Sequence, residues 1–154
     1  MKVPKLEIKR LQLIEINERH INNLFTIYKD EEVMRYCDCC VHKSIAEKKD
    51  LLALFERRIK EGTGISWGVS LKDNPQNIIG TISYKNYVKD FTANIGYLLS
   101  KEFWHQGIMM EALNIFIEYG FTKLGIRRME AHIISGNKHS EKHDKRLVSK
   151  KKDY

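Results

Sequence analysis

Residues 94–124 read NIGYLLSKEFWHQGIMMEALNIFIEYGFTKL, and this stretch decides the fold more than any other part of the chain. Its pattern predicts a short apolar strand, a loop, and a long amphipathic helix that begins at Gly107. The first N–H groups of a helix lack backbone partners and carry a partial positive charge, and glycine allows a ligand to approach the backbone closely. The junction at Gly107 is therefore a candidate binding loop for a cofactor with a pyrophosphate. A glycine between a strand and a helix is more often a simple turn, so spacing alone leaves both interpretations open.

The chain contains neither a Gly-x-x-x-x-Gly-Lys-Ser/Thr motif nor a Gly-x-Gly-x-x-Gly after a strand. The stretch instead resembles the cofactor-binding segment of the GNAT superfamily of N-acetyltransferases, and most of all its RimJ/RimL branch of ribosomal-protein N-terminal acetyltransferases. Residues 95–97 (Ile-Gly-Tyr) match the family's strand, and residues 111–113 (Glu-Ala-Leu) match the start of its helix. Residues 119–121 (Tyr-Gly-Phe) and 124–128 (Leu-Gly-Ile-Arg-Arg) are also similar. The resemblance extends over about residues 11–140, most of the chain.

The resemblance implies an α+β fold of the GNAT type, with a mixed, mostly antiparallel sheet flanked by helices. It implies an enzyme that transfers an acetyl group from acetyl-CoA, its cosubstrate, to a primary amine of a protein N-terminus or a small molecule. The strand backbone would pair with the pantetheine amides, and the loop amides would hold the pyrophosphate. The cofactor-binding residues implied in this way are Tyr97, Leu98, Leu99, His105, Gln106, Gly107, Ile108, Met109 and Asn137.

Several positions depart from the family's pattern. Asn94 stands where relatives often carry a glutamate, which could act as a general base, whereas an amide cannot accept the proton. Trp104 stands where Arg or Gln is usual. Met109 replaces a small residue and could crowd the pyrophosphate. The chain therefore supports cofactor binding better than fast chemistry.

The candidate catalytic residues are Ser140 and the position of Asn94. Ser140 could match a serine or tyrosine that protonates the departing thiolate in many relatives. Tyr84 and Asn86 could line the acceptor side, while Glu111 fits an acid stabilised by the dipole in a first helical turn. No strong general base stands out.

The length of 154 residues indicates one domain with an adequate core. No apolar run is long enough to span a bilayer, and the N-terminus lacks the apolar core of a signal peptide, so we expect a cytoplasmic protein without membrane contact. Residues 37–40 (Cys-Asp-Cys-Cys), with His42 nearby, offer too few ligands at suitable spacing for a metal site. We expect these cysteines to be reduced thiols.

Residues 138–154 contribute +4 of the net charge of +7, so the rest of the chain is nearly balanced. The resemblance ends abruptly at about residue 140, where the family continues with a further helix and strands. We therefore expect an incomplete GNAT domain at 1–140 and a basic tail at 141–154, the result of a frameshift. The last strand would then be an exposed edge that a second subunit could cover in a homodimer.

Two alternatives follow from these features. A truncated, inactive acetyltransferase would bind the cofactor poorly or not at all. A basic RNA- or ribosome-binding module would use the lysines of the tail, although the body of the chain has no recognisable nucleic-acid motif.

The remaining elements follow from periodicity and turn signals. Helices are expected over 21–28, in a short piece at 33–37, and from a capping box at Ser44 to Gly62. Strands are expected at 11–16, 65–71 (half-buried), 78–84, 92–99 and 128–134.

Overall fold

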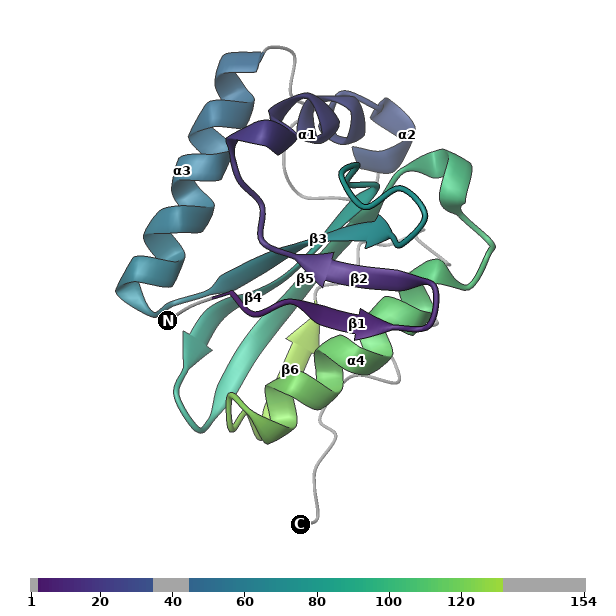
Figure 1. Cartoon of the computed structure of the whole chain (residues 1–154). Helices are drawn as coiled ribbons and strands as arrows, with labels where there is room; N and C mark the ends of the chain where they lie inside the picture. Colours follow the sequence, from purple (N-terminus) through teal and green to yellow (C-terminus); the bar gives the residue numbers. More distant parts are fainter. Residues whose placement is uncertain (1–2, 35–44, 132–154) are drawn as a thin grey trace.

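The computed structural model describes residues 3–34 and 45–131. A six-stranded sheet with the order β1-β2-β3-β4-β5-β6 forms its centre (Figure 1). Neighbouring strands are antiparallel, except that β5 and β6 are parallel. The strands are β1 (Leu6–Ile8), β2 (Leu11–Ile14), β3 (Ile65–Leu71), β4 (Gly80–Val88), β5 (Thr92–Leu99) and β6 (Arg128–Ala131). The helices are α1 (Ile21–Tyr28), α2 (Glu31–Met34), α3 (Ile45–Glu61) and α4 (Ile108–Thr122), with 3₁₀ turns η1 (Glu18–His20) and η2 (Lys101–Phe103).

The helices cover the two faces of the sheet unequally, with α1 to α3 on one face and α4 on the other (Figure 1). On the α4 face, Trp67, Tyr84 and Phe116 form an aromatic cluster and are fully buried. The rings of Tyr84 and Phe116 stack with their centroids 3.9 Å apart, and Trp67 meets Phe116 edge-on at 5.7 Å. A second, smaller core joins α1 and α3 to the opposite face and contains Leu24, Ile27, Leu52, Phe55 and Ile78.

Helix α4 lies unusually close to the sheet at Gly120. A Cβ atom at this position would lie 2.2 Å from the Tyr84 hydroxyl and 2.6 Å from Cε of Met129, which is too close for any side chain. The Tyr84 hydroxyl donates a hydrogen bond to the carbonyl oxygen of Phe116 in the same helix. Glycine at position 120 therefore allows α4 to pack closely against this face of the sheet.

The structure confirms the strand at 92–99 and the helix and strand that follow it, and it shows that β5 and β6 are parallel. It corrects the expectation of a half-buried strand at 65–71, because Ile65 to Ser70 of β3 are buried on both faces. Strand β1 was missed, since three residues are too few to show a period. The cysteine cluster, the capping box at Ser44, and the whole segment from residue 132 lie outside the described residues.

Candidate active site

The described residues pair β5 with β6 from Thr92 to Ile95. The parallel register pairs these residues with Arg128 to Ala131, the last described residue of β6. Residues 96–99 continue along β5 to the loop before α4 and pair with β4 on the other side. The expectation that the pantetheine arm enters a gap beside residues 97–99 as an additional strand stays a prediction.

The loop that follows β5 leads to the start of α4. Gly107 precedes the helix with φ 77°, and His105 also has a positive φ of 62°. No side chain caps the helix start, and His105, Gln106 and Gly107 are exposed. The loop thus presents the positive end of a 15-residue helix to the surface, which is suited to a phosphate group.

Trp104 fixes the beginning of this loop against the strand. Its indole Nε1 donates a hydrogen bond to the carbonyl oxygen of Leu99 at 2.8 Å. One backbone acceptor of the predicted pantetheine site is therefore already engaged within the protein. The replacement of Arg or Gln by Trp at this position gives the loop an anchor that the sequence did not reveal.

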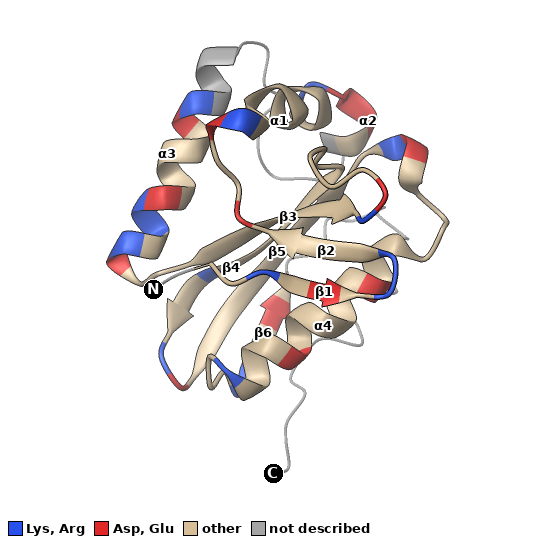
Figure 2. Ribbon diagram, viewed as in Figure 1, with Lys and Arg blue, Asp and Glu red and all other residues tan. Residues whose placement is uncertain are grey.

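Arg10, in the turn between β1 and β2, fixes the end of the loop. Its guanidinium donates to the carbonyl oxygen of Gln106 and forms an ion pair with Glu111, with Nη2 2.9 Å from Oε2. Figure 2 shows that this turn is basic. Arg10 is about half exposed, so its positive charge lies at the surface next to the candidate phosphate loop. No local sequence pattern indicates this contact, because 96 residues separate Arg10 from Gln106.

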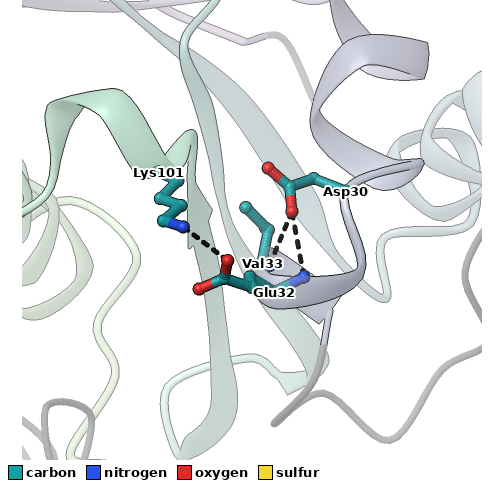
Figure 3. A network of polar contacts seen from close by, with 4 residues as sticks. All are labelled: Asp30, Glu32, Val33 and Lys101. Atoms are coloured by element: carbon teal, nitrogen blue, oxygen red, sulfur yellow. Dashed lines mark hydrogen bonds and ion pairs between the residues drawn. The ribbon is translucent and has the colours of Figure 1, made fainter.

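A second contact holds the loop from the other side of the sheet (Figure 3). Lys101 in η2 forms an ion pair with Glu32 of α2. Asp30 caps the start of α2 by accepting hydrogen bonds from the backbone N–H groups of Glu32, at 2.9 Å, and Val33, at 3.4 Å. The loop is therefore tied to α2 at one end and to the β1–β2 turn at the other.

Two predictions about single residues are wrong. The Met109 side chain is only 7% exposed and belongs to the core beneath α4, so it points away from the loop surface instead of crowding it. Tyr84 is also fully buried on the α4 face, where burial raises the pKa of its hydroxyl well above 10.0, so it cannot line an acceptor site on the opposite face. The position of Asn86, exposed and with φ 51° near the bulge in β4, leaves that expectation open.

The structure describes one of the two candidate catalytic positions. Asn94 lies on β5 between Lys85 of β4 and Glu130 of β6. Ser140 and Asn137 lie outside the described residues, so their relation to Asn94 stays a prediction. Glu111 occupies the first turn of α4, as expected from the dipole argument.

Comparison with known proteins agrees with this geometry. Residues 10–147 match the family described as "Acetyltransferase (GNAT) domain". The chain is 31% identical over 140 residues to the uncharacterized N-acetyltransferase YoaA of Bacillus subtilis (strain 168), covering 90% of this chain and 78% of YoaA. The chain belongs to the GNAT acetyltransferase family.

Two solved structures share the fold. The ribosomal L7/L12 α-N-protein acetyltransferase RimL, in complex with coenzyme A, superposes with a TM-score of 0.82 at 20% identity, covering 94% of this chain and 82% of RimL. The microcin C7 self-immunity acetyltransferase MccE, in complex with acetyl-CoA and AMP, gives 0.77 at 19% identity, covering 91% of this chain and 78% of MccE. These comparisons confirm the predicted fold and the predicted class of enzyme.

No helix among the described residues is long and apolar enough to cross a membrane. No group of three or more His, Cys, Asp or Glu side chains within residues 3–34 and 45–131 could hold a metal ion.

Proposed function

We propose that this chain transfers the acetyl group of acetyl-CoA to a primary amine at the gap beside β5. The observation that carries the proposal is the exposed, uncapped helix start at Gly107 in the loop that follows β5. This helix start suits a pyrophosphate, and the backbone of residues 97–99 would pair with the amide groups of the pantetheine arm. RimL and MccE, which share the fold, were solved with coenzyme A and acetyl-CoA, respectively.

The reaction requires an amine without its proton. The nitrogen lone pair attacks the thioester carbonyl and the C–N bond forms. The C–S bond then breaks, and the proton that the nitrogen loses is taken up by the leaving thiolate, directly or through water. Backbone N–H groups near Leu98 would stabilise the oxyanion of the intermediate. Asn94 cannot accept the amine proton, so the proposed mechanism relies on binding the amine neutral and on positioning it against the thioester.

The acceptor is proposed to be a protein N-terminus or a small amine. The first is supported by the likeness to RimL, which acts on the N-terminus of a ribosomal protein, and by the resemblance to the RimJ/RimL branch. The second is supported by the likeness to MccE, a microcin C7 self-immunity acetyltransferase that was solved in complex with acetyl-CoA and AMP.

Calorimetric titration with acetyl-CoA tests the proposal, with desulfo-CoA as a control for reactions of the thiol. We expect micromolar binding by the wild-type chain and at least about 10-fold weaker binding by Gly107→Ala, because alanine at φ 77° distorts the loop. Gly62→Ala is a matched control: Gly62 has φ 75° and open space around its Cβ position, but it lies at the end of α3. It shares the backbone strain of the first variant but should bind the cofactor normally.

A folded wild-type chain that binds no acetyl-CoA would contradict the proposal and support an inactive acetyltransferase. A deletion of residues 141–154 separates the RNA-binding alternative. An RNA-binding module would lose affinity for RNA and its salt dependence, whereas acetyl-CoA binding should not change.

A further inference from the structure

The face of β4 and β5 opposite α4 carries two polar side chains that have no partner among the described residues. Lys85 and Asn94 lie directly opposite each other in the antiparallel pair. Within the described residues, neither side chain takes part in a hydrogen bond or ion pair. Both are half-buried, so they are neither fully solvated nor sealed in the core.

The Lys85 side chain lies across the sheet toward the expected gap beside β5. Its Nζ is 3.0 Å and its Cε 3.1 Å from the position that a Cβ atom would occupy at Gly96. The ammonium group therefore lies over the β5 backbone, in space that is open because residue 96 is a glycine. Gly96 also follows Ile95, where the described pairing of β5 with β6 ends, and lies one position before the proposed pantetheine contacts.

The neighbouring polar groups on this face are already paired. The Ser83 hydroxyl donates to the Ser66 hydroxyl at 2.7 Å, and both residues are buried. Glu130, beside Asn94, is in an ion pair with Arg128 at 2.9 Å. Lys85 thus has no carboxylate of the described chain to neutralise it, although acidic partners are available to the other lysines and arginines of the sheet, such as Lys72 and Arg128.

We propose that Lys85 and Asn94 together bind a carboxylate of the amine acceptor, so that the preferred substrates are amines with an anionic group near the nitrogen. The Lys85 ammonium supplies the charge, and the Asn94 amide supplies a second N–H donor beside it. The proposal rests on acetyl transfer at the β5 gap as described above. In this proposal Asn94 binds the substrate as a hydrogen-bond donor. An amide can do this, whereas it cannot act as a base.

The carboxylate could be a free chain end or an acidic side chain near a peptide N-terminus, and two substrate pairs separate these sources. The first pair is glycylglycine and glycylglycinamide; the second is Ala-Glu-Ala-amide and Ala-Gln-Ala-amide. Within each pair the reacting amine is the same and only the remote negative charge differs. We expect the wild-type chain to prefer the anionic member of one pair by roughly 10- to 100-fold in kcat/KM, as for a hydrogen bond to a charged group.

Variants assign the preference to the two residues. Lys85→Met keeps an apolar chain over Gly96 but removes the charge, and it should abolish the preference by raising KM for the anionic acceptor. The KM for the neutral acceptor and the affinity for acetyl-CoA should not change. Lys85→Arg should restore most of the preference, and Asn94→Ala should reduce it by a smaller factor. Lys89→Met is the control, since Lys89 is an exposed lysine in the turn of the same hairpin.

The outcomes distinguish this inference from the proposed function. Equal turnover of both members of both pairs would overturn the inference and leave acetyl transfer intact, as would a preference that survives in Lys85→Met. If turnover is too slow to measure, the same peptides can be titrated into the chain saturated with desulfo-CoA, and calorimetry then compares their affinities directly. Equal affinities within both pairs would again overturn the inference. Failure to bind acetyl-CoA is measured separately and concerns the proposed function itself.

Discussion

The two faces of the β4–β5 hairpin are built from alternate residues of the same strands, but they serve different purposes. On the α4 face, Tyr84 and Ile95 are buried with Phe116 in an aromatic and aliphatic core. On the opposite face, Lys85 and Asn94 are half-buried and unpaired within the described chain. One face thus holds the domain together, and the other keeps polar groups available beside the expected gap in the sheet.

Burial alone does not distinguish the faces, because the second also contains sealed polar residues. Ser66 and Ser83 are buried and bond to each other, as do Gln12 and Ser70. A buried hydroxyl costs little when its partner is supplied, whereas an unpaired one is expensive. On this face of β4, the polar side chains with a hydrogen-bond partner therefore end at Ser83. The polar side chains that are available to a ligand begin at Lys85.

The largest effect is expected on the α4 face. Phe116→Ala should lower the free energy of unfolding by about 3–5 kcal/mol, because it removes the ring that stacks on Tyr84 and leaves a cavity beneath α4. Urea unfolding measures the loss, and Asn114→Ala, an exposed change in the same helix, should stay within about 0.5 kcal/mol of wild type. A cost for Phe116→Ala similar to that of the control would show that α4 does not seal this face.

A smaller effect is expected from the sealed polar pair. Ser83→Ala should cost about 1–3 kcal/mol, because the buried Ser66 hydroxyl loses its partner. Adding Ser66→Ala should recover part of this loss, since no buried hydroxyl is then left unpaired. Urea unfolding of both single variants and the double variant gives the coupling energy. Strictly additive losses would contradict a direct hydrogen bond.

Local patterns were enough to predict most of the fold. Strand β5 was predicted with its observed bounds, and α4 with its N-terminal glycine, because both have long, regular periods and a clear turn between them. The resemblance to the family supplied the mixed, mostly antiparallel sheet, whereas the structure identifies β5 and β6 as the parallel pair. Strand β1 was missed because it is short, and β3 was misjudged because the small polar residues Ser66 and Ser70 look like solvent-facing positions although they are paired and buried.

The site could be predicted only where it follows the chain. The loop and its glycine are local features, so they could be located from the sequence. Arg10 contacts the start of α4, and Lys101 of the loop contacts α2. These contacts join positions 69 to 101 residues apart, so no local sequence pattern predicts them. The orientation of Met109 also depends on where the helix begins, since a shift of one residue rotates its side chain by about 100° around the axis.

The pH dependence of stability that arises from His20, at the end of η1, is expected to be an effect of intermediate size. The backbone N–H of Asn17 donates to its Nδ1 at 3.1 Å, and burial, with a smaller contribution from Arg19, lowers the pKa of His20 below 6.5. The unfolded chain therefore binds the proton more readily, so stability is full above pH 6.5 and falls as the pH drops through the lower folded pKa.

Thermal unfolding between pH 8 and 5 measures this dependence. His20→Gln keeps an acceptor for Asn17 but does not titrate, so its stability should fall less over the same range. The difference should be smaller than the loss in Ser83→Ala, because His20 lines an open surface cavity of about 600 Å³ and is not enclosed by the core. Equal slopes for both proteins would show that His20 is not held neutral in the folded chain.

The smallest effect on stability is expected at the ion pair between Lys101 and Glu32, which connects the loop before α4 to α2 on the other face of the sheet. Both side chains are about half exposed, with 51% and 54% of their surface accessible, so water screens the attraction and Lys101→Met should cost less than about 1 kcal/mol. The same change should weaken acetyl-CoA binding more than it weakens the fold, because Lys101 ties the start of the loop to α2. Lys123→Met, an exposed change just after α4, should alter neither property. Urea unfolding and acetyl-CoA titration could instead show equal losses of free energy in Lys101→Met. The ion pair would then stabilise the whole domain and not the loop in particular. The distinction between a stabilising face and a binding face would not apply to this contact.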